Sequence, residues 1–258
     1  MGGLDRILAI AGNTMREAVR SRVLYTLLFF AMALIGTGML LSTLSYVERD
    51  RILQDVGFAA IRVFGVAIAI FVGIGLVHRE VDRRTVYTIL SKPIARSEFL
   101  LGKYLGLLAT LLLQVVVMGA CFAGVSWLAE APLTAAHAAA LAGIGLELAV
   151  VVALALLFSS ITTPMLASFF TAGMWLVGNL TRDLRALGAQ SDAASVAQVT
   201  ELLYRALPDL KAFGFASHAA HGHPLASSDL LLPAVYGLGY VVLALGVAVL
   251  AFERRDFR

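Results

Sequence analysis

The chain has 258 residues, of which 60% are hydrophobic and 14% are charged, and its mean hydropathy is +0.87. Soluble domains have about 45–50% apolar and about 25% charged residues, so this composition favours a membrane protein and excludes a disordered chain. Cys121 is the single cysteine, which excludes a disulfide scaffold, and a net charge of +3 is too balanced for a nucleic-acid-binding protein.

Six apolar stretches are long enough to cross a bilayer, because about 20 helical residues span roughly 30 Å of hydrocarbon. The predicted spans are residues 23–44, 56–77, 104–129, 135–158, 163–180 and 230–252. No segment outside them is large enough for a separate globular domain. We therefore predict an all-α, polytopic membrane protein in which residues 1–258 form one transmembrane domain.

The segment before the first predicted span, residues 1–22, has an amphipathic pattern. Apolar side chains recur at three- and four-residue spacing from Leu4 to Val19, and Arg6 and Arg16 lie on the opposite face. This pattern is typical of a basic helix that lies in the membrane interface. A role as a simple anchor and a role in coupling to a partner are both open.

Lys and Arg are concentrated on one side of the predicted spans. The enriched segments are residues 1–22, 78–103 and 253–258. Because positively charged loops stay in the cytoplasm, both termini and the loop of residues 78–103 are predicted to be cytoplasmic. The long segment 181–229 is then an external loop.

The loop after the second predicted span is long and densely charged. Glu80 to Leu90 predicts a short helix that Pro93 ends, and Ser97 beside Glu98 is expected to cap the helix that follows. A short helix tied to two spans could carry force from a partner into the bilayer. The alternative is a solvated basic loop that serves only to orient the chain.

The external loop predicts one further helix. Ser191 or Asp192 can cap it, its apolar face runs from Val196 to Leu207, and Pro208 ends it. We favour a structural cover over the spans, with a lid at an exit pathway as the alternative.

Small residues recur every four positions at two places. These are Gly65, Ala69 and Gly73, and also Gly102 and Gly106. Such spacing favours close packing of helices in membranes, within one subunit or between subunits.

Three polar side chains fall inside predicted spans. Glu147 lies near the midpoint of the fourth span, where a charged acid costs about 2.5–3.5 kcal/mol, and such residues mark pathways or ion pairs. We favour a neutral Glu147 hydrogen-bonded to a neighbouring helix, with a pathway or gating role as the alternative. Arg62 is a possible partner, but we expect its side chain to snorkel toward the bilayer surface. Gln114 is the third candidate.

His218, His221 and His223 are the histidines with metal-ligand character, because three neutral imidazoles could converge on Zn²⁺ or Cu²⁺. We favour a solvated loop and expect no metal site. An intramembrane enzyme is the less favoured function, because neither H-E-x-x-H nor a serine in a glycine-rich turn occurs. A scaffold that anchors a partner without transport is the other alternative.

The loop of residues 78–103 resembles the signature region of the type-2 ABC export permeases. That family commonly shows E-x-x-x-G-T, then leucines, a P-x-[ST]-R-like turn and a G-K that opens the third span. The matching positions here are Glu80, Thr85, Leu90, Pro93, Arg96, Gly102 and Lys103. Arg84 replaces the glycine of the family pattern. The layout of the whole chain and the tail of residues 252–257 are also similar, with a likeness to permeases of the nitrous-oxide-reductase-maturation type.

The resemblance implies the permease subunit of an ATP-driven exporter in a bacterial inner membrane, paired as a homodimer or heterodimer. It also implies a separate ATPase subunit that binds ATP and Mg²⁺. The sequence agrees, because this chain has no G-x-x-x-x-G-K-[ST] motif. We therefore expect the chain to be neither an enzyme nor a cofactor-binding protein. The residues expected to contact the ATPase are Glu80, Asp82, Arg83, Arg84, Thr85, Leu90, Pro93, Arg96 and Lys103. The cargo stays unidentified.

Overall fold

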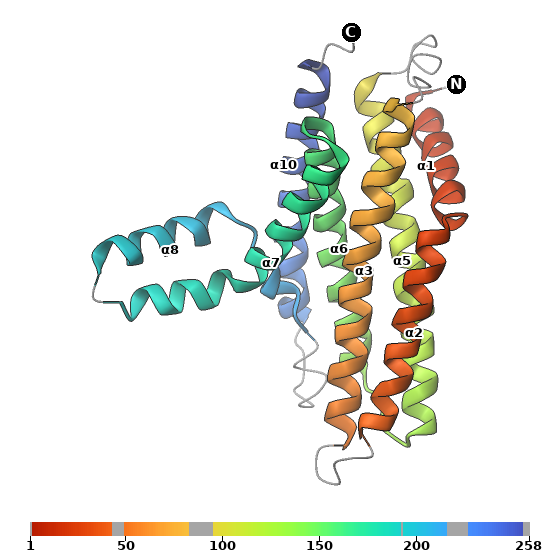
Figure 1. Ribbon diagram of the computed structural model, residues 1–258, viewed down its shortest axis with the longest axis vertical. Coiled ribbons are helices and arrows are strands. Elements are labelled where there is room, and N and C mark those ends of the chain that lie inside the picture. The colour runs from red at the N-terminus through yellow and green to blue at the C-terminus, as the bar shows by residue number, and fades with distance from the viewer. Residues whose placement is uncertain (1, 43–48, 83–94, 192, 216–226, 255–258) are drawn as a thin grey trace.

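A computed structural model describes residues 2–42, 49–82, 95–191, 193–215 and 227–254. Within these ranges every regular element is a helix, which confirms the all-α class (Figure 1). The elements are α1 Gly3–Val19, α2 Arg22–Ser42, α3 Arg49–Asp82, α5 Arg96–Leu128, α6 Ala135–Ile161, α7 Pro164–Ala189, α8 Ala194–Ala206, the 3-10 helix η1 Leu210–Phe213 and α10 Ser227–Arg254.

Five of the helices in the described ranges are long and apolar enough to cross a membrane. They are Arg22–Ser42, Asp50–Leu76, Arg96–Leu128, Ala135–Ile161 and Asp229–Phe252. Each contains or overlaps one predicted span. The remaining prediction, residues 163–180, falls in α7, which is less apolar because glycines, hydroxyl side chains and Asn179 interrupt it. A sixth span therefore stays a prediction.

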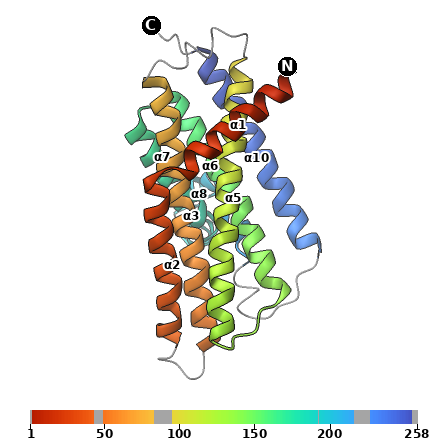
Figure 2. The same ribbon diagram turned by 90° about the vertical axis from the view of Figure 1, so that its right-hand side faces the viewer.

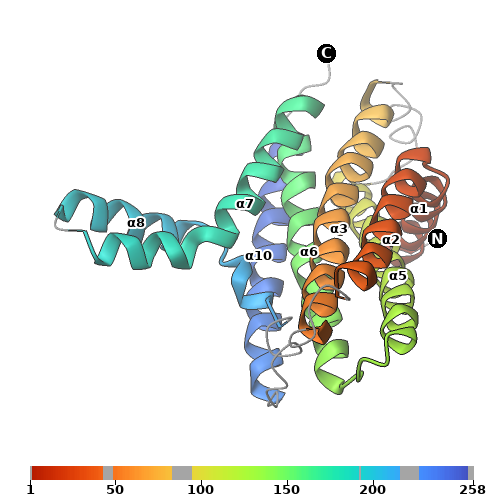
Figure 3. The ribbon, with the colours of Figure 1, turned by 60° about the horizontal axis from the view of Figure 1, so that its bottom comes forward.

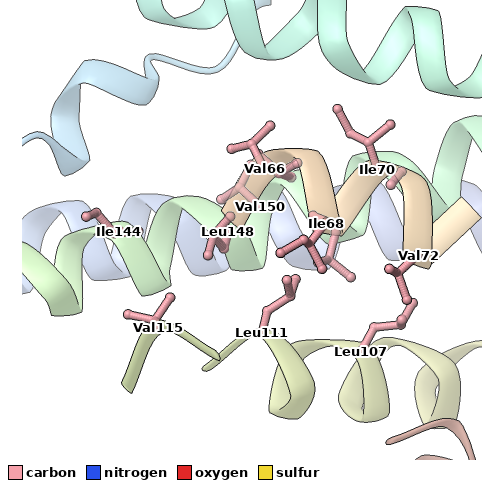
Figure 4. Packing of buried hydrophobic residues seen from close by; sticks show 14 of the residues in the cluster. Val66, Ile68, Ile70, Val72, Leu107, Leu111, Val115, Ile144, Leu148 and Val150 are labelled. Carbon is pink, nitrogen blue, oxygen red and sulfur yellow. The ribbon is translucent and has the colours of Figure 1, made fainter. Parts of the chain in front are cut away.

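The core lies where α3, α5 and α6 face one another. Figure 4 shows Leu107 and Leu111 of α5 pointing toward Ile68 and Val72 of α3. Helix α6 is the most enclosed element, because most of its side chains are buried. Since α6 is apolar on all sides, it packs against α3, α5, α7 and α10 at once.

Helix α1 crosses the side of α5 at the end of the bundle that holds both termini (Figure 2). The two glycines of α5 permit this contact, since a Cβ at Gly106 would lie 2.5 Å from the carbonyl oxygen of Ala11 and one at Gly102 would lie 2.7 Å from Ile10. Arg6 adds a 2.9 Å salt bridge to Glu98. The predicted close packing at these glycines is confirmed, and it occurs within one subunit.

Replacing Gly106 by valine is expected to detach α1 from α5. The Ala11 carbonyl is backbone and cannot rotate away from a new Cβ, so α1 must shift, at a cost of about 1–3 kcal/mol typical of overpacking. Limited proteolysis of the purified protein would report this as faster cleavage within α1. Gly124→Val is the matched control, because it lies on the same helix with open space around it. Equal cleavage of the two variants would contradict the packing role of Gly106.

The C-terminal part of α7 and helix α8 form a hairpin that projects sideways from the bundle (Figures 1 and 3), whereas the first part of α7 packs on α6 and α3. Two salt bridges stabilise the hairpin. Arg185 of α7 pairs with Glu201 of α8 at 2.8 Å, and Lys211 of η1 pairs with Asp183 of α7 at 2.6 Å. The helix predicted in the external loop is thus confirmed as α8, although its N-cap is Ala193.

The expectation that this helix covers the spans is wrong. Helix α7 continues as a helix to Ala189, nine residues past the predicted end of the fifth span, and this extension carries α8 away from the bundle. On the predicted apolar face of α8, Val196 and Val199 are exposed and Leu203 and Leu207 are half-buried.

Candidate functional site

An ion pair joins α3 to α6 in the interior of the bundle. The Arg62 guanidinium donates from Nε to Oε2 of Glu147 at 2.6 Å and from Nη2 to Oε1 at 2.9 Å. Glu147 is 1% exposed, whereas the Arg62 side chain is 30% exposed. This two-point geometry is the strongest arrangement available to a guanidinium and a carboxylate.

Helix α7 supplies two further partners to the pair. Trp175 donates its indole N–H to Oε1 of Glu147 at 2.7 Å, and Arg62 donates from Nη2 to the amide oxygen of Asn179. Asn179 in turn donates to the carbonyl of Trp175 at 2.9 Å, one helical turn earlier. We call Arg62, Glu147, Trp175 and Asn179 the charge network.

The charge network corrects the expectation for Arg62. Its side chain does not snorkel but turns inward to Glu147, because a buried carboxylate without a cation costs far more than the loss of contact with the bilayer surface. The predicted hydrogen bond of Glu147 to a neighbouring helix is confirmed, with two helices involved. The 2.6 Å contact between Arg62 and Glu147 has the geometry of a salt bridge.

A cavity of about 180 Å³ adjoins the charge network. It is lined by Asp55, Phe58, Arg62, Glu147, Phe213 and Phe215, among others. The segment after η1 closes one wall, because Gly143 of α6 lets the backbone oxygen of Phe213 and the ring of Phe215 approach closely. The network therefore borders a space between α3, α6 and η1, where a change in the pair could alter access.

Gln114 lies outside the charge network. Its side chain is buried on α5, and neither amide atom has a hydrogen-bond partner in the part of the chain that the structure describes. The structure thus confirms that Gln114 lies inside the bundle, but Gln114 makes no hydrogen bond to Arg62 or Glu147.

The loop of residues 78–103 is described only at its two ends. Helix α3 continues to Asp82, so Glu80 and Asp82 are the last turn of α3 and not the start of a separate helix. The side chains of Glu80 and Asp82 lie outside the described residues, as do five further predicted contact residues. These five are Arg83, Arg84, Thr85, Leu90 and Pro93.

At the other end of the loop, Arg96 contacts the last helix of the chain. It donates from Nη1 to the carbonyl oxygen of Phe252 at 2.7 Å, and Phe99 stacks on the ring of Phe252. The cap of α5 is Ala95, whose N–H is accepted by Glu98 at 3.2 Å, so the expected Ser97 cap is wrong.

Lys103 is 1% exposed, with its ammonium 5.7 Å from the centre of the Phe99 ring. This burial favours a role in packing over direct contact with a partner. The three histidines at positions 218, 221 and 223 lie outside the described residues. Within the described ranges, no group of three or more His, Cys, Asp or Glu side chains could hold a metal ion.

Trp175 and Asn179 were missed by sequence reasoning. Both fall in the fifth predicted span at a spacing of four, so they share one helix face. An amide inside an apolar helix, one turn from an indole, is a signal that could have drawn attention to that face.

The chain matches a known protein family. The model of the ABC-2 family transporter proteins matches residues 8–257, which is nearly the whole chain. No curated protein matches.

Proposed function

This chain belongs to the ABC-2 family of transporter proteins, and from this premise we propose that it is the permease subunit of an ATP-driven exporter. It is a multi-pass membrane protein of the class that partners an ABC ATPase subunit. In our proposal, six spans place both termini in the cytoplasm of a bacterial inner membrane, and α1 lies at the interface. Two permease subunits, identical or related, pair with two ATPase subunits that bind ATP and Mg²⁺.

The observation that carries the proposal is the family match, since it includes both ends of the loop of residues 78–103. The structure supplies a route for force from that loop. Helix α3 continues into the loop as far as Asp82 and also carries Arg62, about five and a half turns earlier along one unbroken helix. A push on the loop would therefore move Arg62, and the charge network would transmit the movement to α6 and α7.

The other end of the loop supports the same role. Arg96 starts α5 and holds the end of α10 through the Phe252 carbonyl. A displacement of the loop would thus act on α3 and α5 together, and through Arg96 on α10. We propose that ATP-driven closure of the partner moves these helices and opens a path for the cargo.

Mild-detergent purification of the tagged chain from its native membrane tests the proposal. We expect a protein with a Walker A motif to co-purify with the wild type and to be lost from the Glu80→Lys and Arg83→Glu variants. Mass spectrometry of the eluate gives the measurement. The matched control is Asp50→Lys, which reverses a charge at the opposite end of α3 and should retain the ATPase.

If no ATPase is retained under several gentle conditions, the permease assignment fails. If it is retained equally by all variants, Glu80 and Arg83 do not hold the ATPase, and the binding role of the loop fails.

A further inference from the structure

A second cavity, of about 410 Å³, lies where the α7–α8 hairpin joins α10. It is lined by Arg182, Tyr204, Arg205, Asp209, Leu232 and Tyr236, among others. We call it the arginine cavity. It is distinct from the cavity at the charge network, because the two have no lining residue in common.

Both arginines present unused donors to this cavity. Arg182 donates from Nε to Oδ2 of Asp209 at 2.6 Å, and Arg205 donates from Nε to Oε1 of Glu201 at 2.8 Å. Among the described interactions, no terminal guanidinium nitrogen of either residue has a partner. The Arg182 and Arg205 side chains are 51% and 75% exposed, so these nitrogens are open to a ligand.

The carboxylates act as positioning groups for the guanidiniums. Asp209 is 7% exposed, and its backbone N–H donates to the Tyr236 hydroxyl at 2.7 Å, which fixes Asp209 against α10. The hydrogen bond from Arg205 lowers the pKa of Glu201, so Glu201 stays ionised at neutral pH. Each arginine is therefore anchored at Nε while its outer edge stays free.

The rest of the lining is apolar and aromatic. Leu232, Pro233, Tyr236 and Tyr240 belong to the first turns of the α10 span, so the cavity lies at one end of that span. Leu232 is 73% exposed, and the neighbouring Leu231 and Val235 are exposed on the same helix. An apolar chain can follow this side of α10 while its head group lies at the guanidiniums.

We propose that the arginine cavity binds a phosphate group through Arg182 and Arg205, with the head group of an anionic phospholipid as the source. Arg205 shares its carboxylate, Glu201, with Arg185, so three guanidiniums stand against two carboxylates around the cavity and leave a net positive charge. Guanidinium forks match phosphate oxygens. The exposed apolar side of α10 accounts for the acyl chains. The proposal does not rest on transport, because it requires only that α10 spans the bilayer.

Binding of three probes to the purified full chain in detergent tests the site. The probes are dioctanoyl-phosphatidylglycerol, inorganic phosphate and dioctanoylglycerol, and the binding of each is measured by isothermal calorimetry. We expect the phosphatidylglycerol to bind and Arg205→Gln to weaken it by about tenfold, as the loss of one charge-assisted contact implies. Arg182→Gln combined with Asp209→Asn should have the same effect, and this pair leaves no buried carboxylate without its cation.

Lys211→Gln is the matched control, since it removes an exposed cation of η1 that pairs with the hairpin but does not line the cavity. If it weakens binding as much as Arg205→Gln, net charge explains the affinity and the site is refuted. Equal binding of dioctanoylglycerol also refutes it, because that probe lacks phosphate. Inorganic phosphate that displaces the phosphatidylglycerol at equal concentration supports phosphate recognition and assigns the source to a free phosphate.

Discussion

Arg62→Leu is expected to lower the free energy of unfolding by about 3–5 kcal/mol, because it leaves the Glu147 carboxylate without its cation inside the bundle. Glu147→Leu should lower the free energy of unfolding by a similar amount, since it leaves the Arg62 guanidinium without its carboxylate. The double variant Arg62→Leu/Glu147→Leu should regain most of the loss, because replacing a buried ion pair by apolar side chains is often nearly neutral. Denaturant unfolding in detergent, followed by tryptophan fluorescence, gives the three values.

The matched control is Asp183→Asn, which breaks the exposed salt bridge to Lys211. It should change the free energy of unfolding by less than about 1 kcal/mol. If the two single losses at Arg62 and Glu147 simply add in the double variant, the two side chains do not form an energetically coupled pair, and the charge network is not what holds α3 to α6.

The same double variant separates stability from function. A stable complex that no longer transports would show that the pair serves as a moving contact between α3, α6 and α7. Full transport by the double variant would show that the pair serves the stability of the fold and not the transport movement.

Charge reversal at Glu80 or Arg83 is expected to uncouple ATP hydrolysis from transport in any complex that still assembles. Transport, measured as restoration of a strain that lacks the chain, should fall by roughly tenfold or more while the assembled complex continues to hydrolyse ATP, which corresponds to about 1.4 kcal/mol or more in the coupled step. The cause is the position of Glu80 in the last turn of α3, with Arg83 directly after that helix in the sequence, so that a changed contact there no longer moves α3. ATP hydrolysis by the reconstituted complex and restoration of a strain that lacks the chain would be measured side by side.

Asp50→Lys again serves as the control, because it changes charge on α3 at the end remote from the loop. It should restore the strain as the wild type does. Wild-type restoration by Glu80→Lys and Arg83→Glu would refute the coupling role of the loop, even with the family assignment intact.

The predicted spans show how much of the helical structure follows from the local sequence pattern. The apolar runs predicted α2, α5, α6 and α10 to within a few residues at every end except the start of α5, where the helix begins earlier than the apolar run. In α3 and α7 the helix continues well past the apolar run into polar sequence, so the run marks only part of each helix. A helix continues as long as its backbone hydrogen bonds are satisfied, and hydropathy marks only the part that lies in hydrocarbon.

The glycines of α5 were found for a related reason. The four-residue spacing of Gly102 and Gly106 already placed both on one helix face, where close approach is possible. That α1 is the helix that approaches them depends on the path of the chain after Val19, which no local pattern contains.

What the sequence determined by itself is therefore whatever depends on neighbours along the chain: the all-α class, most of the long apolar helices, and Glu147, Arg62 and Gln114 as polar side chains within them. The tertiary structure alone decided the partners. Arg62 and Glu147 are 85 positions apart, and Trp175 and Asn179 come from a third helix. Helical periodicity gives the face on which a side chain lies, but the helix that faces it is set by packing of the whole bundle, where a buried charge must find its counterion.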